Sequence, residues 1–252
     1  MSPDLRDPSY LDALDASGSK AADFALQIIR TTGPFLTKSV SDLDVLDLGC
    51  GYAHTALELA RHVRKVVGME PSGALHQGAL KLRAQREVRN IELRHAGIEG
   101  VHEREAYDLI VLDNVFEHLP DQPEALRRLS RALRAGGAIF VLTPNKLWPI
   151  EAHYRLPFLA YLPLPLANVY LRLTGRGSDY TDASYAPTYG RVKRLFLAHP
   201  ELEFSFELPE NLGLTYSGAA LHYRVGASLI RRFPFLWRVS KSFLIIARKA
   251  GR

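Results

Sequence analysis

Short apolar runs alternate with longer amphipathic segments along most of the chain. The runs are rich in Val, Ile and Leu and have the length of strands, whereas the segments between them repeat apolar residues at the spacing of a helix. Strands that alternate with helices form parallel sheets covered on both faces, so the pattern predicts an α/β fold with a doubly wound sheet. We expect the strands over residues 43–48, 65–69, 91–95, 108–113, 138–143, 201–208 and 242–249.

The first expected helix covers residues 11–30, where Leu14, Phe24 and Ile28 share one face and Gly33-Pro34 follows. We expect this helix to cap a ligand site in the core. A glycine-rich turn at 135–138 is expected to separate the helix over residues 123–134 from the strand over residues 138–143. The later helices are expected over residues 55–62, 73–86, 123–134 and 189–199.

The end of the first expected strand has the composition of a ligand-binding turn. Asp47, Gly49 and Gly51 follow an apolar run, and a helical segment begins at Thr55. Glycines let the backbone adopt conformations that a Cβ hinders, and a helix start offers free N–H groups to a carboxylate or phosphate. The second strand ends on Glu70, about twenty residues after the turn, where a carboxylate can hold two ribose hydroxyls. A nucleotide-like ligand is therefore expected here.

Two further segments complete a family pattern. Residues 107–114 have the composition of a strand, and Glu117-His118-Leu119 follows it closely. Together with the D-x-G-x-G turn and the acidic second strand, this series resembles the class I S-adenosylmethionine-dependent methyltransferases over roughly residues 43–145. The resemblance implies a Rossmann-like, seven-stranded sheet, S-adenosyl-L-methionine as the cofactor, and a site at the carboxyl ends of the first strands.

The resemblance also assigns residues to the cofactor site. Many family members have G-D-A-E after the third strand, where this chain has Ala96-Gly97-Ile98-Glu99, so backbone at Gly97 and Ile98 is expected to contact the adenine. The Asp113 carbonyl is expected to accept from the cofactor's amino group. The residues expected to bind the cofactor are Asp47, Gly49, Gly51, Glu70, Gly97, Ile98 and Asp113.

Two histidines are candidates for the general base. Methyl transfer to a hydroxyl needs one group to take the proton, and imidazole has a suitable pKa. His118 follows the fourth strand, and His153 begins the next segment, so we expect both beside the reacting methyl group. Some relatives bind a divalent metal through E-x-x-E-H. Because Asn114 replaces the first of those carboxylates, no metal is expected.

Residues 144–190, which we call the lid segment, are too long for a plain connection. The part from Leu156 to Leu171 has no charged residue and contains three prolines, which makes it a poor membrane span. A helical lid over the site fits better, and its aromatic content indicates a greasy or aromatic acceptor; a lid that only packs on itself is the alternative. The aromatic residues are Trp148, Tyr154, Phe158, Tyr161 and Tyr170.

Composition sets the outer limits. The 252 residues, 47% hydrophobic and 23% charged, suffice for one methyltransferase domain. Its expected parts are an N-terminal helical cap (1–42), a cofactor-binding core (43–143), the lid segment (144–190), and C-terminal helices with the last two strands (191–252). The single cysteine excludes an internal disulfide, and the first residues lack the pattern of a secretory signal. We therefore expect a cytoplasmic protein.

Charge is distributed unevenly. Residues 1–50 carry four Lys or Arg against eight Asp or Glu, whereas residues 211–252 carry eight Lys or Arg and no acidic residue. The basic residues near 229–238 lie among Leu, Ile, Phe and Trp, which favours peripheral attachment to an anionic membrane at its inner face. A solvated basic face over ordinary core residues is the alternative.

These features together predict methyl transfer to the oxygen of a hydrophobic, aromatic, lipid-linked or glycan-type small acceptor. A nucleic-acid acceptor is disfavoured, since no aromatic platform on a basic groove is evident. A catalytically silent cofactor-binding module at a membrane surface is a second alternative. A nicotinamide oxidoreductase is a third, and the glycine pattern disfavours it, because Ala53 and His54 stand where a third glycine would be.

Overall fold

A seven-stranded mixed sheet organises the protein. The computed structural model describes residues 18–208 and 221–251, and its strands follow the order β3-β2-β1-β4-β5-β7-β6. The first five are parallel, whereas β7 pairs antiparallel with both β5 and β6. The strands are β1 Asp44–Leu48, β2 Lys65–Met69, β3 Ile91–Arg94, β4 Tyr107–Asp113, β5 Leu133–Pro144, β6 Leu202–Glu207 and β7 Ser242–Lys249.

The expected seven-stranded α/β sheet is confirmed, with one difference in strand direction. The pattern predicts a parallel sheet, but β7 runs against its neighbours. A parallel pair needs a connection that crosses the whole sheet, whereas the chain between β6 and β7 starts and ends at the same edge. The hydrophobic periodicity of a strand does not indicate whether it runs parallel or antiparallel to its neighbours.

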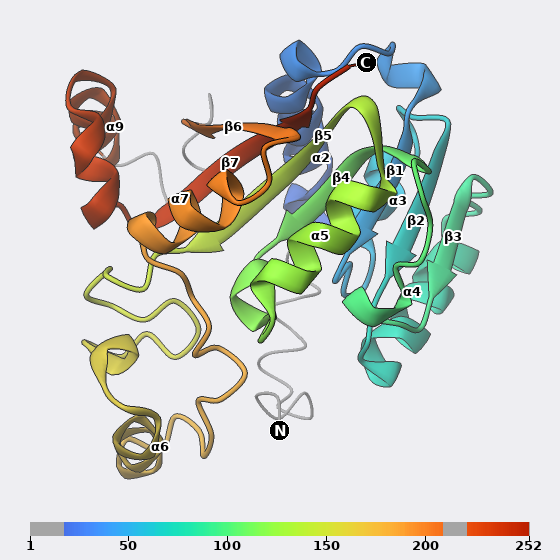
Figure 1. The fold of residues 1–252 in the computed structure, drawn as a ribbon. Coiled ribbons are helices and arrows are strands. Elements are labelled where there is room, and N and C mark those ends of the chain that lie inside the picture. Colours follow the sequence, from blue (N-terminus) through green and yellow to red (C-terminus); the bar gives the residue numbers. More distant parts are fainter. Residues whose placement is uncertain (1–17, 209–220, 252) are drawn as a thin grey trace.

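Helices cover both faces of the sheet (Figure 1). On one face α5 and α7 pack against alternate strand residues such as Leu46, Ile110 and Val141. On the other, α2, α3 and α4 enclose the opposite set, including Val45 and Val111. The helices are α2 Gly18–Thr32, α3 His54–Leu59, α4 Gly73–Gln85, α5 Gln122–Ala132, α6 Leu164–Leu173, α7 Tyr189–Leu197 and α9 Leu221–Arg232.

Short 3₁₀ turns join several of these elements. They are η1 Gly33–Phe35, η2 Val40–Asp42, η3 Ile98–Gly100, η4 Phe116–His118, η5 Leu159–Tyr161 and η6 Pro234–Val239. The turn η4 directly follows β4 and begins the segment that carries His118. It therefore sets the direction of a candidate base at the carboxyl edge of the sheet.

The chain reverses its order at β1. This strand has β2 on one side and β4 on the other, so the loops after β1 and β4 leave toward opposite faces and open a crevice between them. The lid segment begins at the carboxyl end of β5, the neighbour of β4, and lies beyond that edge of the sheet (Figure 1). The topology thus brings the turn, η4 and the lid segment to one edge.

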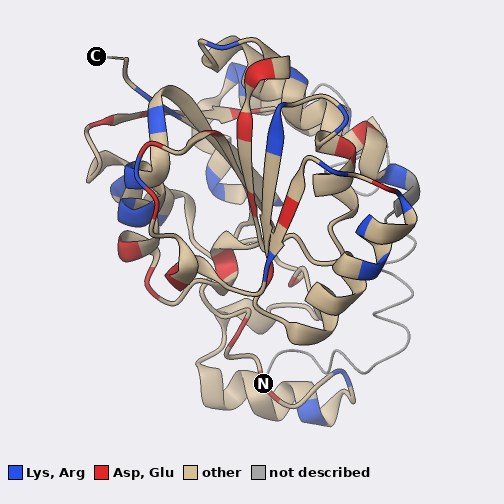
Figure 2. Cartoon of the chain, turned by 90° about the vertical axis from the view of Figure 1, so that its right-hand side faces the viewer, with Lys and Arg blue, Asp and Glu red and all other residues tan. Residues whose placement is uncertain are grey.

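The lid segment has a small core of its own. Leu159, Ala167 and Leu171 are fully buried or nearly so, and Tyr154 and Tyr180 pack with them. Its helix α6 is almost uncharged, as the lower edge of Figure 2 shows. Among the described helices, none is long and apolar enough to cross a membrane.

Two expected helix ends differ, and the first is that α2 continues to Thr32 instead of ending at Arg30. Helix α2 buries Phe24 and Ile28 against the sheet, where Phe24 meets the ring of Phe140 edge-on, whereas Leu14 lies outside the described residues. The expected helix at 123–134 ends at Ala132, and β5 starts at once with Leu133 beside Tyr107. The glycines expected to separate the helix from the strand lie within β5, because β5 already begins with the pairing of Leu133 and Tyr107.

Gly137 tests how tightly that irregular strand start is packed. A Cβ built there would lie 2.7 Å from the Asp108 carbonyl oxygen, a backbone atom that cannot rotate away. We expect Gly137→Ala to lower the free energy of unfolding by about 1–3 kcal/mol in urea denaturation. Gly190→Ala in α7, where nothing lies within 4 Å, should leave it unchanged or raise it by up to about 1 kcal/mol. Equal stability of the two variants would show that β5 yields more easily than its geometry indicates.

Candidate active site

The turn after β1 takes a left-handed conformation at three positions. Gly49, Gly51 and Ala53 have φ values of 71°, 57° and 63°. At Gly49 a Cβ would also lie 2.5 Å from a methyl of Val115, whereas at Gly51 nothing lies within 4 Å. Gly49 therefore allows close packing against the segment after β4, and Gly51 leaves open space over the backbone. Ala53 holds this conformation without being glycine, which costs some backbone strain.

Glu70 ties this turn to the end of β2. It is 6% exposed, and its two carboxylate oxygens accept from the N–H of Gly51 at 2.9 Å and of Ser72 at 2.8 Å. An oxygen of a carboxylate has two lone pairs, so Glu70 can accept further hydrogen bonds while it holds the turn. Its carboxylate lies beside the glycines, as the sequence analysis expects.

Two further carboxylates lie under the turn without a cation beside them among the described residues. Burial raises the pKa of Asp47 to about 8, with smaller contributions from Asp113 and Glu70. Burial also raises the pKa of Asp113 to about 7, and Glu117 adds to it. A cationic ligand would favour the ionised forms of both. S-adenosylmethionine, which carries a sulfonium and an ammonium group, fits this cluster.

The segment after β3 is closed by its own carboxylate. Glu99 Oε1 accepts from the Gly97 N–H at 2.8 Å, and a Cβ at Gly97 would lie 2.7 Å from Glu99 Oε2. Ile98 starts η3 and packs against the core beneath the sheet. The carboxylate that the family pattern has at position 97 is absent, and Glu99 takes up the space beside it.

Each candidate base is paired with a carboxylate. His118 Nδ1 lies 3.2 Å from Asp182 Oδ2, and His153 Nδ1 lies 2.8 Å from Glu151 Oε1. The two imidazole rings meet edge to face with centroids 5.0 Å apart. Burial lowers the pKa of His118, but the carboxylates of Asp182 and Glu117 outweigh it, so this pKa is raised. The structure therefore brings together two histidines that are 35 positions apart in the sequence.

Glu117 lies behind this pair. It is fully buried, and its Oε2 accepts from the Thr143 hydroxyl at 2.9 Å. Its Oε1 has no hydrogen-bond partner among the described residues and lies 3.8 Å from His153 Nε2. Burial raises the pKa of this carboxyl. Donor atoms of Glu117, His118 and His153 lie within 4.8 Å of one another, so these side chains could hold a metal ion.

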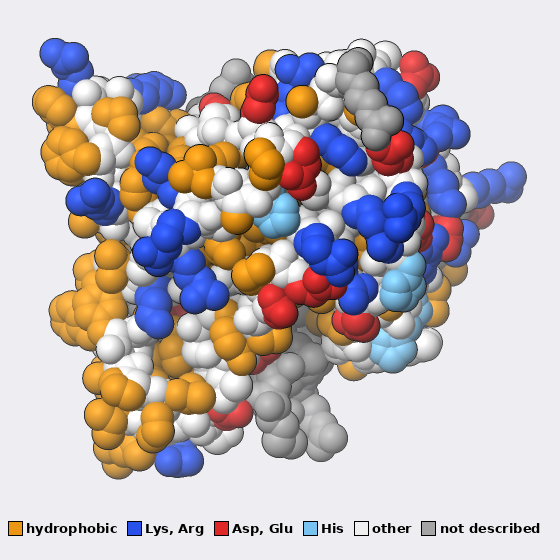
Figure 3. Space-filling view, in the orientation of Figure 1, with side chains coloured by type: hydrophobic (Ala, Val, Ile, Leu, Met, Phe, Trp, Pro, Cys, Tyr) orange, Lys and Arg blue, Asp and Glu red, His pale blue; other side chains and the backbone are white. Residues whose placement is uncertain are grey.

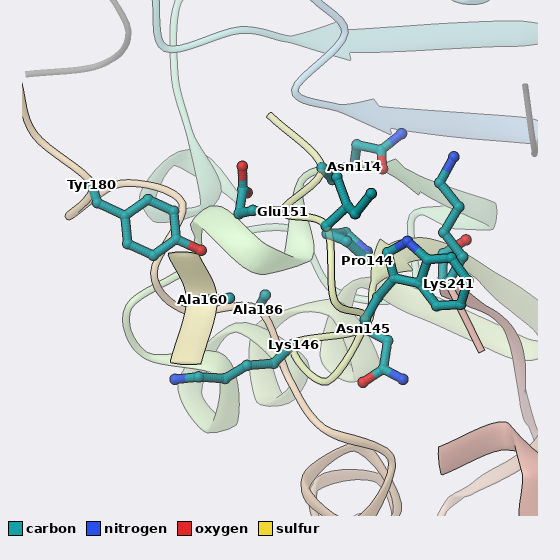
Figure 4. Close-up of a pocket in the computed structure, with 13 residues that line it drawn as sticks. Asn114, Pro144, Asn145, Lys146, Glu151, Ala160, Tyr180, Ala186 and Lys241 are labelled. Atoms are coloured by element: carbon teal, nitrogen blue, oxygen red, sulfur yellow. The ribbon is translucent and has the colours of Figure 1, made fainter. Parts of the chain in front are cut away.

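A pocket opens between the end of β5 and the lid segment (Figure 4). Asn114, directly after β4, forms part of its wall, which places the pocket beside the carboxyl edge of the sheet. Its volume is about 170 Å³, which is smaller than the usual volume of sites that enclose a drug-sized molecule. The lining residues are Asn114, Pro144, Asn145, Lys146, Trp148, Ile150, Glu151, Ala152, Ala160, Tyr180, Ala186, Lys241 and Ser242.

No sequence pattern identifies the partners of the two histidines. Asp182 and Glu151 orient them, and Tyr180 lines the pocket, yet none of the three belongs to a recognisable motif. The signal available was polarity: acidic residues are rare in this apolar segment. Which histidine each one faces depends on how the segment folds back, and spacing does not give that.

Comparison with known proteins places this geometry in a family. A model of a methyltransferase domain family matches residues 21–184, more than half of the chain. The chain belongs to the class I S-adenosylmethionine-dependent methyltransferases. Membership makes S-adenosylmethionine the cofactor and methyl transfer the reaction of this enzyme, and it removes the nicotinamide alternative.

Curated relatives and solved structures agree with this placement. The methyltransferase is 35% identical over 109 residues to the ubiquinone biosynthesis O-methyltransferase of Bradyrhizobium sp. (strain ORS 278), covering 43% of each chain. It is 28% identical over 182 residues to that of Acinetobacter baylyi, covering 71% of this chain and 69% of the relative. The matches to the first two relatives thus span about half of those relatives' length.

Solved structures show the same fold at low identity. The plantazolicin methyltransferase BpumL in complex with SAH superposes with a TM-score of 0.63 at 16% identity, over 99% of this chain and 91% of that chain. The YcgJ protein from Bacillus subtilis superposes with a TM-score of 0.56 at 15% identity, over 93% of this chain and all of that one. At this low sequence identity, these similarities establish only the fold of the protein.

The raised pKa of Asp47 predicts a proton linkage. Without ligand, Asp47 is protonated below about pH 8, and a bound sulfonium favours the carboxylate, so binding releases protons. We expect affinity for S-adenosylmethionine to rise with pH up to about 8, and calorimetry in buffers of different ionisation enthalpy to report this release. S-adenosylhomocysteine, which lacks the sulfonium charge, should release fewer protons. Identical proton release for both ligands would contradict the prediction.

The raised pKa of Asp47 also predicts how the stability of the folded protein depends on pH. Its folded pKa lies above the unfolded value of 3.8, so the folded state binds more protons between about pH 4 and 8 and loses stability as pH rises through this window. Asp47→Asn should therefore be more stable than the wild type at pH 8 while binding cofactor more weakly. The exposed Asp42→Asn should change neither property in the same denaturation and binding assays.

Proposed function

We propose that this enzyme methylates a hydroxyl oxygen of a hydrophobic, aromatic, lipid-linked or glycan-type small molecule, with His118 or His153 as the general base. The observation that carries the proposal is the pair of imidazoles at the edge of the sheet where the cofactor turn lies. The Nδ1 atom of His153 is bonded to Glu151, and that of His118 lies 3.2 Å from the Asp182 carboxylate. Such a partner fixes the ring orientation and leaves Nε2 to take a proton. The names of the curated relatives, ubiquinone biosynthesis O-methyltransferases, support oxygen as the acceptor atom.

The proposed step is an in-line displacement. The acceptor oxygen forms a bond to the methyl carbon, the carbon–sulfur bond breaks, and S-adenosylhomocysteine leaves with the electron pair. The hydroxyl proton goes to a histidine and from there to solvent. Little covalent help is needed, so positioning and a water-poor pocket supply most of the acceleration.

We propose the following roles on the cofactor side. Glu70 accepts from the ribose hydroxyls, Gly49 and Gly51 let the backbone approach, and Asp47 with the Asp113 carbonyl faces the cationic end. Backbone at Gly97 and Ile98 contacts the adenine. Two observations support these roles. The residues lie around the turn after β1 or at the neighbouring strand ends, and the raised pKa values of Asp47 and Asp113 favour a cationic ligand.

Substitution of the histidines tests the base. We expect His118→Ala or His153→Ala to lower turnover by about 10²- to 10⁴-fold with little change in cofactor affinity. If His118 is the base, its raised pKa places the rising limb of the pH–rate profile above the ordinary value for histidine, and Asp182→Asn should move that limb to lower pH. The exposed His102→Ala serves as the control. Wild-type rates in both alanine variants would show that positioning alone suffices.

A second role for the same side chains is to hold a divalent cation. The unpartnered Oε1 of Glu117 and the converging imidazoles favour it, since metal-bound histidines commonly donate their other nitrogen to a carboxylate. Full activity in excess chelator would dispose of this alternative. Loss of activity that Mg²⁺ or Mn²⁺ restores would support it, and would make the three residues ligands.

We also propose that the enzyme attaches peripherally to anionic membranes. Among the described residues, fifteen large hydrophobic side chains are exposed, and fourteen of them lie in the lid segment or in residues 221–239. They gather along one edge of the molecule, over α9 and the lid segment, with Lys and Arg between them (Figure 3). Leu221, Val225 and Leu229 of α9 are 75%, 49% and 45% exposed, so this stripe does not belong to the core.

Charge argues for acidic lipid as the partner. Residues 221–239 contain Arg224, Arg231, Arg232 and Arg238 and no acidic residue. Each basic residue near an anionic surface contributes about 1 kcal/mol, and an apolar stripe beside such residues suits the headgroup boundary. The lid segment adds further exposed apolar side chains close to the pocket that would take the acceptor.

Vesicle co-sedimentation tests this attachment. We expect binding to vesicles with acidic lipid and not to neutral ones, release by salt, and loss with Arg231→Glu plus Arg232→Glu. A control pair on the far side of the sheet, Arg61→Glu plus Lys81→Glu, should leave binding unchanged. Indifference to acidic lipid would contradict the proposal.

A further inference from the structure

One histidine side chain joins the loops that follow β2 and β3, which we call the β2 loop (70–72) and the β3 loop (95–100). His95 Nε2 lies 2.9 Å from the carbonyl oxygen of Pro71. A carbonyl oxygen only accepts hydrogen bonds, so this Nε2 carries the proton and donates it. The backbone joins the same segments a second time, because the Glu70 N–H donates to the Arg94 carbonyl at 3.1 Å. The two loops are therefore bonded to each other at two points.

Packing against α4 fixes the orientation of the His95 ring. The ring of His76, a buried residue of this helix, stacks on it with centroids 5.4 Å apart and an angle of 16° between the planes. Gly73, the first residue of α4, lies beside the ring as well, since a Cβ built there would be 3.5 Å from His95 Cε1. His95 itself is exposed. Its ring is thus held by the helix that follows the β2 loop, although solvent reaches it.

The other hydrogen bonds of the β3 loop do not reach the β2 loop. The Gly97 N–H donates to Glu99 within the loop, and the Glu99 carbonyl accepts from Arg128 of α5 at 3.2 Å. Between the side chains of one loop and the other, the described residues form one hydrogen bond, that of His95. The spacing of the two loops beyond the strand ends therefore depends on this residue.

Both loops carry residues that are proposed above to bind the adenosine part of the cofactor. Glu70 directly precedes Pro71 in the β2 loop, and Gly97 and Ile98 follow His95 closely in the β3 loop. In these roles the ribose contacts the first loop and the adenine contacts the second. One nucleoside then bridges both loops, so the distance between the loops has to match its length.

We propose that His95 is a positioning residue for the cofactor, because its hydrogen bond to Pro71 and its stacking on His76 hold the two loops at the separation that the adenosine requires. The inference rests on the cofactor roles proposed above for the two loops. Loops that already have the bound arrangement lose less conformational freedom when a ligand binds. His95 therefore raises affinity for the cofactor through the loops that it joins.

Substitution of His95 tests this role in the full chain, titrated with S-adenosylhomocysteine by calorimetry. We expect His95→Ala to bind about three- to tenfold more weakly, the equivalent of one hydrogen bond. His95→Gln, whose side-chain amide can donate to Pro71, should stay within about twofold of the wild type. The exposed His102→Ala removes an imidazole elsewhere and should bind like the wild type. Wild-type affinity in His95→Ala, or a loss that His95→Gln does not restore, would overturn the proposal.

A shorter ligand shows which end of the cofactor the substitution affects. 5′-Methylthioadenosine has the adenosine of S-adenosylhomocysteine without its amino and carboxylate groups, so His95→Ala should weaken both ligands by the same factor. A loss confined to S-adenosylhomocysteine would place the effect at the amino-acid end and would also overturn the proposal.

Glu70→Ala separates this inference from the cofactor roles on which it rests. Wild-type affinity for S-adenosylhomocysteine in Glu70→Ala would count against those roles. Weaker binding by Glu70→Ala together with wild-type affinity in His95→Ala would overturn the role of His95 alone.

Discussion

Carboxyl groups at the carboxyl ends of parallel strands, of which Asp47 is buried and Asp113 partly buried, are the constraint on which this site depends. Asp47 and Asp113 end neighbouring strands, and their pKa values of about 8 and about 7 record how poorly the folded protein alone supports their charge. Burying an ionised carboxylate costs free energy of desolvation, and a cation bound beside it offsets that cost. We propose that the cofactor's sulfonium and ammonium groups are that cation, so that cofactor binding also balances the charge of these carboxylates. The strain at Ala53 and the tight packing of Gly49 belong to the same edge.

The lid segment contributes side chains to the site that the core does not contain. The core supplies Glu117 and His118, and the lid segment supplies His153, Glu151 and Asp182, so neither part alone has both an imidazole pair and its orienting carboxylates. Tyr180 shows the same division, because residues of the lid segment fix a side chain that lines a pocket shared with β5 and β7. In the proposed function, the core binds the cofactor, and the lid segment, which has its own small hydrophobic cluster, contributes to binding the acceptor.

The outer surface has an apolar edge beside the pocket. Exposed apolar side chains of α9 and the lid segment lie on one edge together with arginines, and the pocket opens next to the lid segment. The proposed attachment to lipid headgroups would place this pocket beside the membrane, where a hydrophobic acceptor is found.

Local signals in the amino-acid sequence were enough to predict the sheet, its strands and the cofactor turn. Those signals are apolar runs of strand length, two glycines after an aspartate, and a carboxylate at the end of β2. The antiparallel entry of β7, the early start of β5 at Leu133, and the pairing of His118 with Asp182 and of His153 with Glu151 came only from the tertiary structure. These depend on which distant segments meet, and hydrophobic periodicity is silent about that. The position of Tyr180 in the pocket belongs to the same class, because a pocket exists only once β5, β7 and the lid segment have packed together.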